Sequence, residues 1–356
     1  MLTLFDLELY SFDIEQKGIN MKRRHVLSLL GGGVILAAGA TTGVIATRKP
    51  QTALRPWTDV GQGYDDPRMR ALSWAILAPN PHNRQPWLVD LATPDQAILY
   101  ADTTRMLPHT DPFNRQITIG LGCFIELARM AAANDGIAMT ADLFPKGSDT
   151  TAIDKRPVAI LRFGGAATAD PLFAHVPDRR TLKEPYDLTR KVTQATLETT
   201  LAAATMTRVG GSISDQSIAD LRTLTHEALR IEVETPRTYQ ESVDLFRVGA
   251  KAVDANPDGI DFTGPVFELL GAAGMMEREA LVDTTSTSYK EGIKAIFANT
   301  DTAMGHVWQV TDGNTRKDQI TAGRDWLRMN LAATSQGLGI QPLSQALQEY
   351  PEMRAH

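Results

Sequence analysis

The chain has 356 residues, of which 43% are hydrophobic and 22% charged. This is ordinary for a soluble globular protein and long enough for two packed units or one large one. The net charge of −6 argues against nucleic acid as a partner, because such proteins usually carry a basic surface. The one cysteine, Cys123, can form neither an internal disulfide nor an iron–sulfur site, and its apolar neighbours predict a buried, inert thiol.

Residues 1–50 are predicted to be a targeting segment that lies outside the fold. Arg23 and Arg24 precede an uncharged apolar run to about Ala46, an order typical of an export signal. The pair resembles a twin-arginine signal, which a receptor reads as an address. We therefore expect export by the twin-arginine machinery, to the periplasm or to the outer side of the cytoplasmic membrane with this segment as an anchor. Acidic residues before Met21 do not suit a signal, so Met21 is the expected start.

The body begins with a first unit, predicted over residues 51–165. Apolar spacing predicts a helix over residues 68–77 and a long apolar helix over 117–134. Between them, residues 87–91 and 97–100 predict two strands joined by a turn. A third strand is predicted over residues 159–163, and it is expected to end at Gly164 and Gly165. This unit is therefore predicted to run helix, hairpin, helix, strand.

The second unit is predicted over residues 166–356. Its predicted elements are helices over residues 217–234 and 239–253, a strand over 303–310, and loops over 210–214 and 254–262. The pattern Ile-Thr-x-Gly at residues 117–120, followed by Gly-Ile at 136–137, recurs with equal spacing at 320–323 and 339–340. Equal spacing across a whole helix predicts an internal duplication. The predicted fold class is α+β, with each repeat a sheet flanked by helices.

The most specific pattern is Ala-Pro-Asn-Pro-His-Asn-Arg-Gln-Pro-Trp at residues 78–87. It resembles the nitroreductase-superfamily loop, in which Ala-Pro-Ser is followed shortly by Asn-x-Gln-Pro-Trp and which lies beside the flavin ring. Prolines stiffen such a loop, and its polar side chains suit a polar heteroaromatic. Taken singly, each residue is better explained as part of a helix end. The resemblance of the whole string implies cofactor contacts from Asn80, Pro81, His82, Asn83 and Gln85, with Asn80 in place of the family's serine.

A second pattern, at residues 178–186, resembles the family's other flavin motif: an arginine, a hydroxyl residue, a basic residue and then an aromatic. The resemblance implies that Arg179, with Arg180 beside it and the Thr181 hydroxyl, holds the FMN phosphate, since a guanidinium matches phosphate oxygens. It places Lys183 near the flavin pyrimidine edge, where positive charge favours the reduced ring. Alone, this segment is better explained as a solvated basic patch.

The arrangement of the two motifs strengthens the resemblance. In ordinary members the arginine motif precedes the proline–tryptophan loop within one unit, and the flavin sits across a dimer interface. Here the order is reversed, and each unit keeps only one motif. This is the layout of the fused branch of the superfamily, and it implies a pseudo-dimer within one chain that binds one FMN between its halves.

A third match lies late in the chain, at residues 337–345. It resembles the family segment whose backbone packs on the flavin face, which implies contacts from Pro342, Leu343 and Ser344. A core helix that ends at a glycine explains the first part of this segment in any case. The family continues to a further basic segment that grips the phosphate, whereas this chain ends at His356. The sequence therefore predicts either a truncated form or a missing contact.

The resemblance implies an FMN-dependent oxidoreductase that reduces a planar small-molecule acceptor such as a nitroaromatic or a quinone. The flavin carries the chemistry, so no catalytic side chain is predicted, and the electron donor stays open because NAD(P)H is not available outside the cytoplasm. The alternative is an exported flavin-binding or sequestering protein with little turnover, and a weaker one is a pseudoenzyme without flavin. His82 and His109 are too isolated to predict a metal site.

Overall fold

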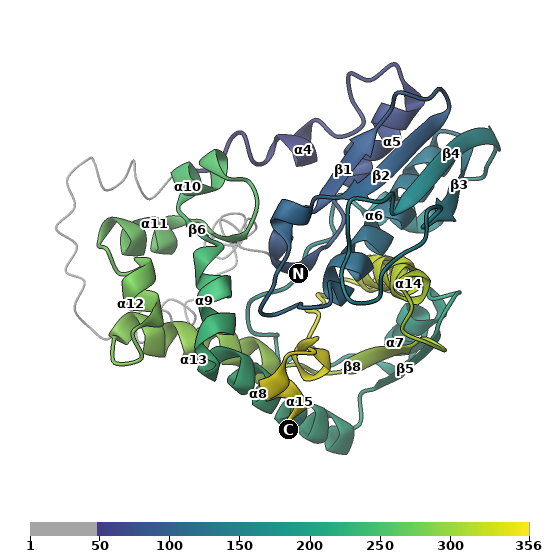
Figure 1. The fold of residues 1–356 in the computed structure, drawn as a ribbon. Coiled ribbons are helices and arrows are strands. Elements are labelled where there is room, and N and C mark those ends of the chain that lie inside the picture. The colour runs from purple at the N-terminus through teal and green to yellow at the C-terminus, as the bar shows by residue number, and fades with distance from the viewer. Residues whose placement is uncertain (1–47, 356) are drawn as a thin grey trace, which may run out of the picture.

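The computed structural model describes residues 48–355. The predicted twin-arginine signal lies outside these residues. The described chain has an α+β fold, as predicted, in which helices cover small sheets. Figure 1 shows the two long helices α6 and α14 side by side near the centre, with the first sheet above them and a group of helices set to one side.

The first unit contains a four-stranded antiparallel sheet. Its strands are β1 (Trp87–Asp90), β2 (Gln96–Ala101), β3 (Ile137–Leu143) and β4 (Ala159–Ala166), in the spatial order β1-β2-β4-β3. Buried and half-buried residues alternate along β2, as expected for a strand with one face on the core. The predicted hairpin is confirmed. The prediction lacks β3, and β4 continues through Gly164 and Gly165 where it was expected to end.

Two helices complete this unit and are confirmed. The first, α5 (Pro67–Ala75), begins at Asp66, whose carboxylate accepts the Arg68 N–H, and its first residue is a proline, as is common at helix starts. The second, α6 (Arg115–Asn134), packs against α5 and against β3. Short helices α4 (Arg55–Thr58), η1 (Pro81–Asn83), η2 (Thr103–Arg105) and η3 (Pro171–His175) lie in the connections.

The second unit follows the same order of helix, strand, strand, helix. Its elements are α7 (Gln194–Ala202), β5 (Arg208–Ser212), β8 (His306–Val310) and α14 (Arg316–Ser335). β5 pairs antiparallel with β8, as β1 does with β2, and α7 packs on α14. The strand predicted over residues 303–310 is confirmed in β8. The loop predicted over 210–214 is wrong, because residues 210–212 belong to β5, whose partner lies far along the chain.

The two long helices cross at glycines. A Cβ atom at Gly122 would lie 2.2 Å from the carbonyl oxygen of Ile320, and a Cβ at Gly323 would lie 1.9 Å from that of Ile119. Only glycine allows two backbones to approach this closely. The two contacts are reciprocal between positions 201 residues apart, whereas the repeated Ile-Thr-x-Gly pattern is spaced by 203. A duplicated helix would give this local two-fold arrangement, with a register two residues away from the sequence match.

An insert over residues 213–305 separates β5 from β8. Its elements are α8 (Asp215–Glu234), α9 (Pro236–Asp244), β6 (Phe246–Val248), α10 (Ala250–Ala255), β7 (Ile260–Phe262), α11 (Pro265–Ala272), α12 (Arg278–Val282) and α13 (Thr287–Asp301). The insert has its own small core, which includes Val243 and Leu281. Figure 1 shows it in green, beside the two units.

The insert corrects two predictions and confirms one. The helix predicted over residues 217–234 is α8. The helix predicted over 239–253 is broken, because β6 pairs in parallel with β7 and Gly249 takes a left-handed φ of 81° before α10. The loop predicted over 254–262 contains β7 for the same reason.

The main core surrounds α6. This helix is long and apolar enough to cross a membrane, but 83% of its most apolar window is buried inside the fold, as in the core helix of a globular unit. Cys123 lies in this core, 1% exposed, and its thiol donates to the Gly323 carbonyl at 3.1 Å. Burial raises the pKa of the Cys123 thiol to about 12. The predicted buried thiol is therefore confirmed.

The C-terminal segment, with η4 (Gln345–Leu347) and α15 (Pro351–Arg354), packs on α8 through Tyr350 and Met353. The Gln348 side-chain amide donates to the buried Glu232 carboxylate at 2.6 Å. Burial, with a smaller effect from the nearby Glu241, raises the pKa of Glu232 to about 7.

Candidate functional site

The proline-rich loop takes a strained conformation. Three of its non-glycine residues, His82, Asn83 and Gln85, lie in the left-handed region, with φ between 47° and 49°. Such residues are costly and are retained where the surroundings hold them in place, often at functional sites. Asn80 holds this loop, because its side-chain oxygen accepts the Gln85 N–H at 2.7 Å and its amide donates to the Ala78 carbonyl at 3.1 Å.

The repeated glycine of the first helix also shapes this loop. A Cβ at Gly120 would lie 3.0 Å from Asn80 Cβ and 3.2 Å from Pro81 Cδ. Gly120 therefore lets α6 pack directly against the loop. His82 is half-buried, and desolvation lowers its pKa to about 4, so its imidazole is neutral at pH 7. Its Nδ1 atom is buried and has no hydrogen-bond partner among the residues that the structure describes.

Arg179 is a buried cation that forms no ion pair within residues 48–355. The residue is 5% exposed, and its Nη2 atom donates to the Leu77 carbonyl at 3.2 Å. Its Nε and Nη1 atoms are buried and have no hydrogen-bond partner in the described part of the chain. Burial, together with the neighbouring Arg180, lowers the pKa of Arg179 to about 10. An unpaired buried charge is expensive, so this guanidinium is suited to an anionic ligand.

This contact joins the two motifs that the sequence places about a hundred residues apart. Leu77, which accepts the hydrogen bond from Arg179, lies three residues before Asn80. The next residue, Arg180, stacks over the Trp57 ring, with 3.6 Å between its Cζ atom and the ring centroid. Arg180 is therefore not a freely solvated charge. The structure thus brings the arginine motif against the base of the proline-rich loop.

The third segment also reaches this place. Thr181 forms a parallel bridge with Ile340, and the Leu182 N–H donates to the Ile340 carbonyl at 3.1 Å. Pro342 is exposed and Leu343 half-buried just beyond this bridge, while the Ser344 hydroxyl donates to the Gln116 side chain at 2.9 Å. All three predicted segments therefore meet, although the side chain of Ser344 is directed to α6.

A short stretch of the insert, residues 257–261, contacts two of the predicted segments. The Gln85 amide donates to the Pro257 carbonyl at 2.6 Å, and the Asn83 amide reaches the same oxygen at 3.4 Å. Lys183 forms an ion pair with Asp261 at 3.0 Å. Three predicted cofactor-binding side chains are therefore bonded to this stretch.

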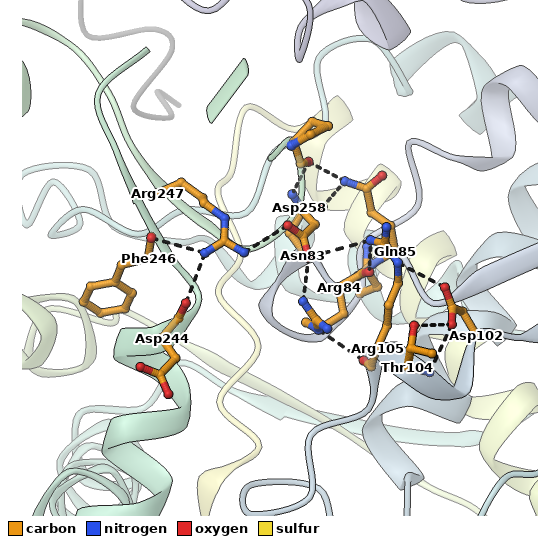
Figure 2. A network of polar contacts seen from close by, with 12 residues as sticks. Asn83, Arg84, Gln85, Asp102, Thr104, Arg105, Asp244, Phe246, Arg247 and Asp258 are labelled. Atoms are coloured by element: carbon orange, nitrogen blue, oxygen red, sulfur yellow. Dashed lines mark hydrogen bonds and ion pairs between the residues drawn. The ribbon is translucent and has the colours of Figure 1, made fainter. Parts of the chain in front are cut away.

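Arginines gather around Asp258 in the same stretch, as Figure 2 shows. Arg84 Nη1 lies 2.5 Å from Asp258 Oδ2, Arg247 Nη2 lies 3.0 Å from Oδ1, and Arg105 Nη1 lies 3.7 Å from Oδ2. Arg105 also pairs with Asp102 at 3.2 Å. Burial, against the attraction of Asp258, lowers the pKa of Arg84. The prediction missed this cluster, because only Arg84 lies in a recognisable motif and no local pattern links it to Arg247 or Asp258.

Two surface hollows lie away from these segments. One, of about 470 Å³, is lined by Asp66, Arg68, Asp95 and Phe163 among others, and the second, of about 580 Å³, by Tyr100, Lys146 and Lys155 among others. Neither hollow includes a predicted cofactor-binding residue. Within residues 48–355, no three His, Cys, Asp or Glu side chains gather as a metal site.

Comparison with known proteins gives one relative in two strains. The chain is 30% identical over 139 residues to the protein named "Putative NAD(P)H nitroreductase acg" of Mycobacterium tuberculosis. The match covers 38% of this chain and 41% of the relative, so the chain spans about two fifths of the length of the relatives it matches. No family model matches the chain. The chain is therefore similar, over part of its length, to a protein that is named as a nitroreductase.

Proposed function

We propose that the chain is an FMN-dependent oxidoreductase, formed by two fused nitroreductase-like halves, that reduces a planar acceptor such as a nitroaromatic or a quinone. The observation that carries the proposal is Arg179, whose buried guanidinium keeps two unpaired nitrogen atoms beside the base of the proline-rich loop. A phosphate would supply the missing acceptors, because its oxygens match a guanidinium. The similarity to a nitroreductase supports the same conclusion.

The residues fit FMN better at its phosphate end than at its ring. Arg179 and the Thr181 hydroxyl would hold the phosphate. Asn83 and Gln85 would face the ring, but their amides donate to the Pro257 carbonyl and would have to exchange this partner. Lys183 would have to leave Asp261 in part to reach the pyrimidine edge. Bound FMN would supply the two-electron chemistry, and these side chains would supply position and charge.

The duplication forms part of this proposal. The units share the order helix, strand, strand, helix, and their long helices cross reciprocally at Gly122 and Gly323. Arg179 precedes the second unit's elements, while its partner Leu77 belongs to the first unit. One composite site between halves that each kept one motif accounts for these contacts, and it implies one FMN in each chain.

A second candidate is a flavin-binding or sequestering protein with little turnover. It is favoured by the bonds between residues 257–261 and three predicted cofactor-binding side chains, because these bonds restrict the space beside the loop. The two candidates differ in one observation. If reductant bleaches the bound flavin and an added quinone or nitroaromatic restores its colour over many cycles, the protein is the enzyme. A single slow cycle would favour the second candidate.

Flavin binding itself is tested by titration with FMN. We expect a yellow protein that releases FMN in acid, at one equivalent per chain. Arg179→Ala should lower the affinity about tenfold or more, and Asn83→Ala by less, because charge-assisted hydrogen bonds are the stronger ones. Arg156→Ala, which removes a partly exposed arginine that pairs with Asp154, is the matched control and should bind FMN as the parent does. A colourless protein that takes up no FMN would overturn the proposal.

Export and electron supply are further parts of the proposal. The basic pair before the uncharged run supports export by the twin-arginine system, and a protein or membrane donor would then replace NAD(P)H. Changing Arg23 and Arg24 together to lysine should leave the protein in the cytoplasm, as measured by fractionation. Normal export of this variant would contradict the assignment.

A further inference from the structure

The arginine cluster around Asp258 carries more positive charge than its carboxylates neutralise. Arg84, Arg105 and Arg247 contribute three charges, and within residues 48–355 their recorded ion pairs are with Asp258 and Asp102 alone. In addition, Arg247 Nε is buried and has no hydrogen-bond partner among the described residues. Backbone carbonyls accept some of the donors: Arg84 Nε donates to the Arg105 carbonyl, Arg105 Nη1 to the Arg84 carbonyl, and Arg247 Nη1 to the carbonyls of Asp244 and Phe246. A guanidinium offers five donors in a planar fork, so the nitrogen atoms that face Asp258 can pair with another carboxylate in its place. Such a group is suited to bind a planar anion.

The cluster lies beside the proposed cofactor site and can be reached from outside. Arg84 stands between Asn83 and Gln85 in the strained loop. The side chains of Arg84 and Arg247 are 12% and 13% exposed, and that of Arg105 is 37% exposed. The three arginines come from three separate places: the loop before β1, the end of η2, and β6. Figure 2 shows them directed toward one point, which the Asp258 carboxylate occupies.

Asp258 is held by a short connection and not by a helix or strand. It lies between α10 and β7, where the Gly259 N–H donates to the Asn83 carbonyl at 3.1 Å. Its two oxygens face different arginines, Oδ1 toward Arg247 and Oδ2 toward Arg84. The carboxylate of a ligand would reproduce both contacts without change in shape. A tetrahedral phosphate would not replace this planar group atom for atom.

We propose that Arg84, Arg105 and Arg247 form a binding site for the carboxylate of an organic acceptor, and that Asp258 occupies this site in the ligand-free protein. The carboxylate site follows from the arginine geometry, whereas the planar and reducible nature of the ligand rests on the proposed function. Because Asp258 is tethered, it competes at a high effective concentration and keeps the affinity of the unaltered protein low.

The test is the binding of 4-nitrobenzoate to oxidised protein, measured by calorimetry without reductant. 4-Nitrobenzyl alcohol, which has the same ring but no charge, is the matched ligand. Asp258→Asn should raise the affinity for 4-nitrobenzoate about tenfold or more and leave that for the alcohol unchanged, because one competing carboxylate is lost. Adding Arg247→Gln to this variant should lower the affinity again by about tenfold. Asp312→Asn removes the same charge from a side chain that is 96% exposed, and should change neither affinity.

Two results would overturn the inference. One is an equal change for the charged and the neutral ligand, and the other is no change in either variant; in both cases Asp258 only anchors the insert. If Asp258→Asn fails to fold, Arg105→Gln in the unaltered protein decides, because its side chain is the most exposed of the three. It should weaken 4-nitrobenzoate binding several-fold, and unchanged binding would count against the site.

The experiment separates this inference from the proposed function. The visible spectrum of the same samples reports whether flavin is bound. A colourless protein that shows the Asp258→Asn gain would keep the carboxylate site and overturn the flavin proposal. A yellow protein that shows no gain in Asp258→Asn would keep the flavin proposal and overturn the carboxylate site.

Discussion

The first unit, from α5 to β4, and the second unit, from α7 to α14, share an order of elements but differ in what joins their paired strands. In the first, residues 91–95 connect β1 to β2. In the second, residues 213–305 connect β5 to β8 and form a separate small core. Most residues of the main core come from the first unit, and α14 adds Ile320, Leu327 and Leu331.

This difference between the units suggests that one part of the molecule serves folding and another part serves binding. The first unit and α14 share the main core and form a platform against which the strained loop packs. Of the charged groups that approach this loop, Arg105 belongs to the first unit, whereas Arg179 comes from the connection before α7, and Arg247 and Asp258 come from the insert. We therefore expect changes at the platform to act on folding, and changes among the approaching charges to act mainly on binding.

The largest effect is expected where the two units touch backbone to backbone. Gly323→Val should lower the free energy of unfolding by more than about 3 kcal/mol, because its Cβ would lie 1.9 Å from a carbonyl oxygen of α6. Urea unfolding measures it. Gly292→Ala in α13 is the control: a Cβ there meets nothing within 4 Å, so the change should be neutral or slightly stabilising. Equal losses of unfolding free energy in both variants would show that the close backbone contact at the crossing does not cause the effect.

A second comparison uses two buried arginines. Arg316 is 1% exposed, and its guanidinium reaches the carbonyls of Asp149 and Thr150 in the first unit and the Thr118 hydroxyl. Arg316→Met should therefore cost about 3 kcal/mol of unfolding free energy, because it leaves these groups unpaired. Arg179→Met should instead raise the stability of the FMN-free protein by about 1 kcal/mol, because it removes an unpaired charge. A stability loss at Arg179 would mean that its charge is satisfied within the fold.

The insert should respond to pH through Glu232. Burial raises the pKa of this carboxyl from 4.5 to about 7, so between these values the folded protein holds a proton that the unfolded chain has released. The free energy of unfolding should therefore fall by about 2 to 3 kcal/mol as the pH rises from about 4.5 to about 7. Glu232→Gln should remove this slope in urea titrations at several pH values. A slope that persists in the variant would assign it to another group.

The smallest effect is expected at the ion pair between Lys183 and Asp261. Both groups are partly exposed, so Lys183→Ala should change the free energy of unfolding by less than about 1 kcal/mol. Thermal unfolding of this variant, with Asp261→Ala as its counterpart, measures the change. A loss above about 2 kcal/mol would show that this pair, and not the hydrogen bonds to Pro257, holds the insert in place.

Much of the platform was predictable, because its elements are written in local patterns. The apolar spacing of α5 and α6 and the hairpin of β1 and β2 follow from neighbouring residues, and the same holds for α8 in the insert. β5 was not predictable in this way, because Gly210 and Gly211 favour a loop locally and the strand exists only by pairing with β8. β6 and β7 are three residues each, too short to show a period, and their parallel pairing interrupts a predicted helix.

In the candidate site, too, the residues in local motifs were predictable and their distant partners were not. The proline-rich loop and the arginine motif were found as strings, and the structure brings them together through Arg179 and Leu77. The bonds from Asn83, Gln85 and Lys183 to the insert were not foreseen, because their partners carry no motif. Which of these side chains touch a cofactor remains a prediction.

Because of its position, the Cys123 thiol can report when α6 and α14 separate. The sequence has one cysteine, and its thiol lies at the crossing of α6 and α14, bonded to the Gly323 carbonyl. A thiol that is 1% exposed can meet an alkylating reagent only when the two helices separate. Its labelling rate in the native protein therefore reports how often α6 and α14 separate, without any introduced probe. A ligand that contacts both the first unit and the second unit would lower this labelling rate, and a ligand that contacts one unit alone would leave the rate unchanged.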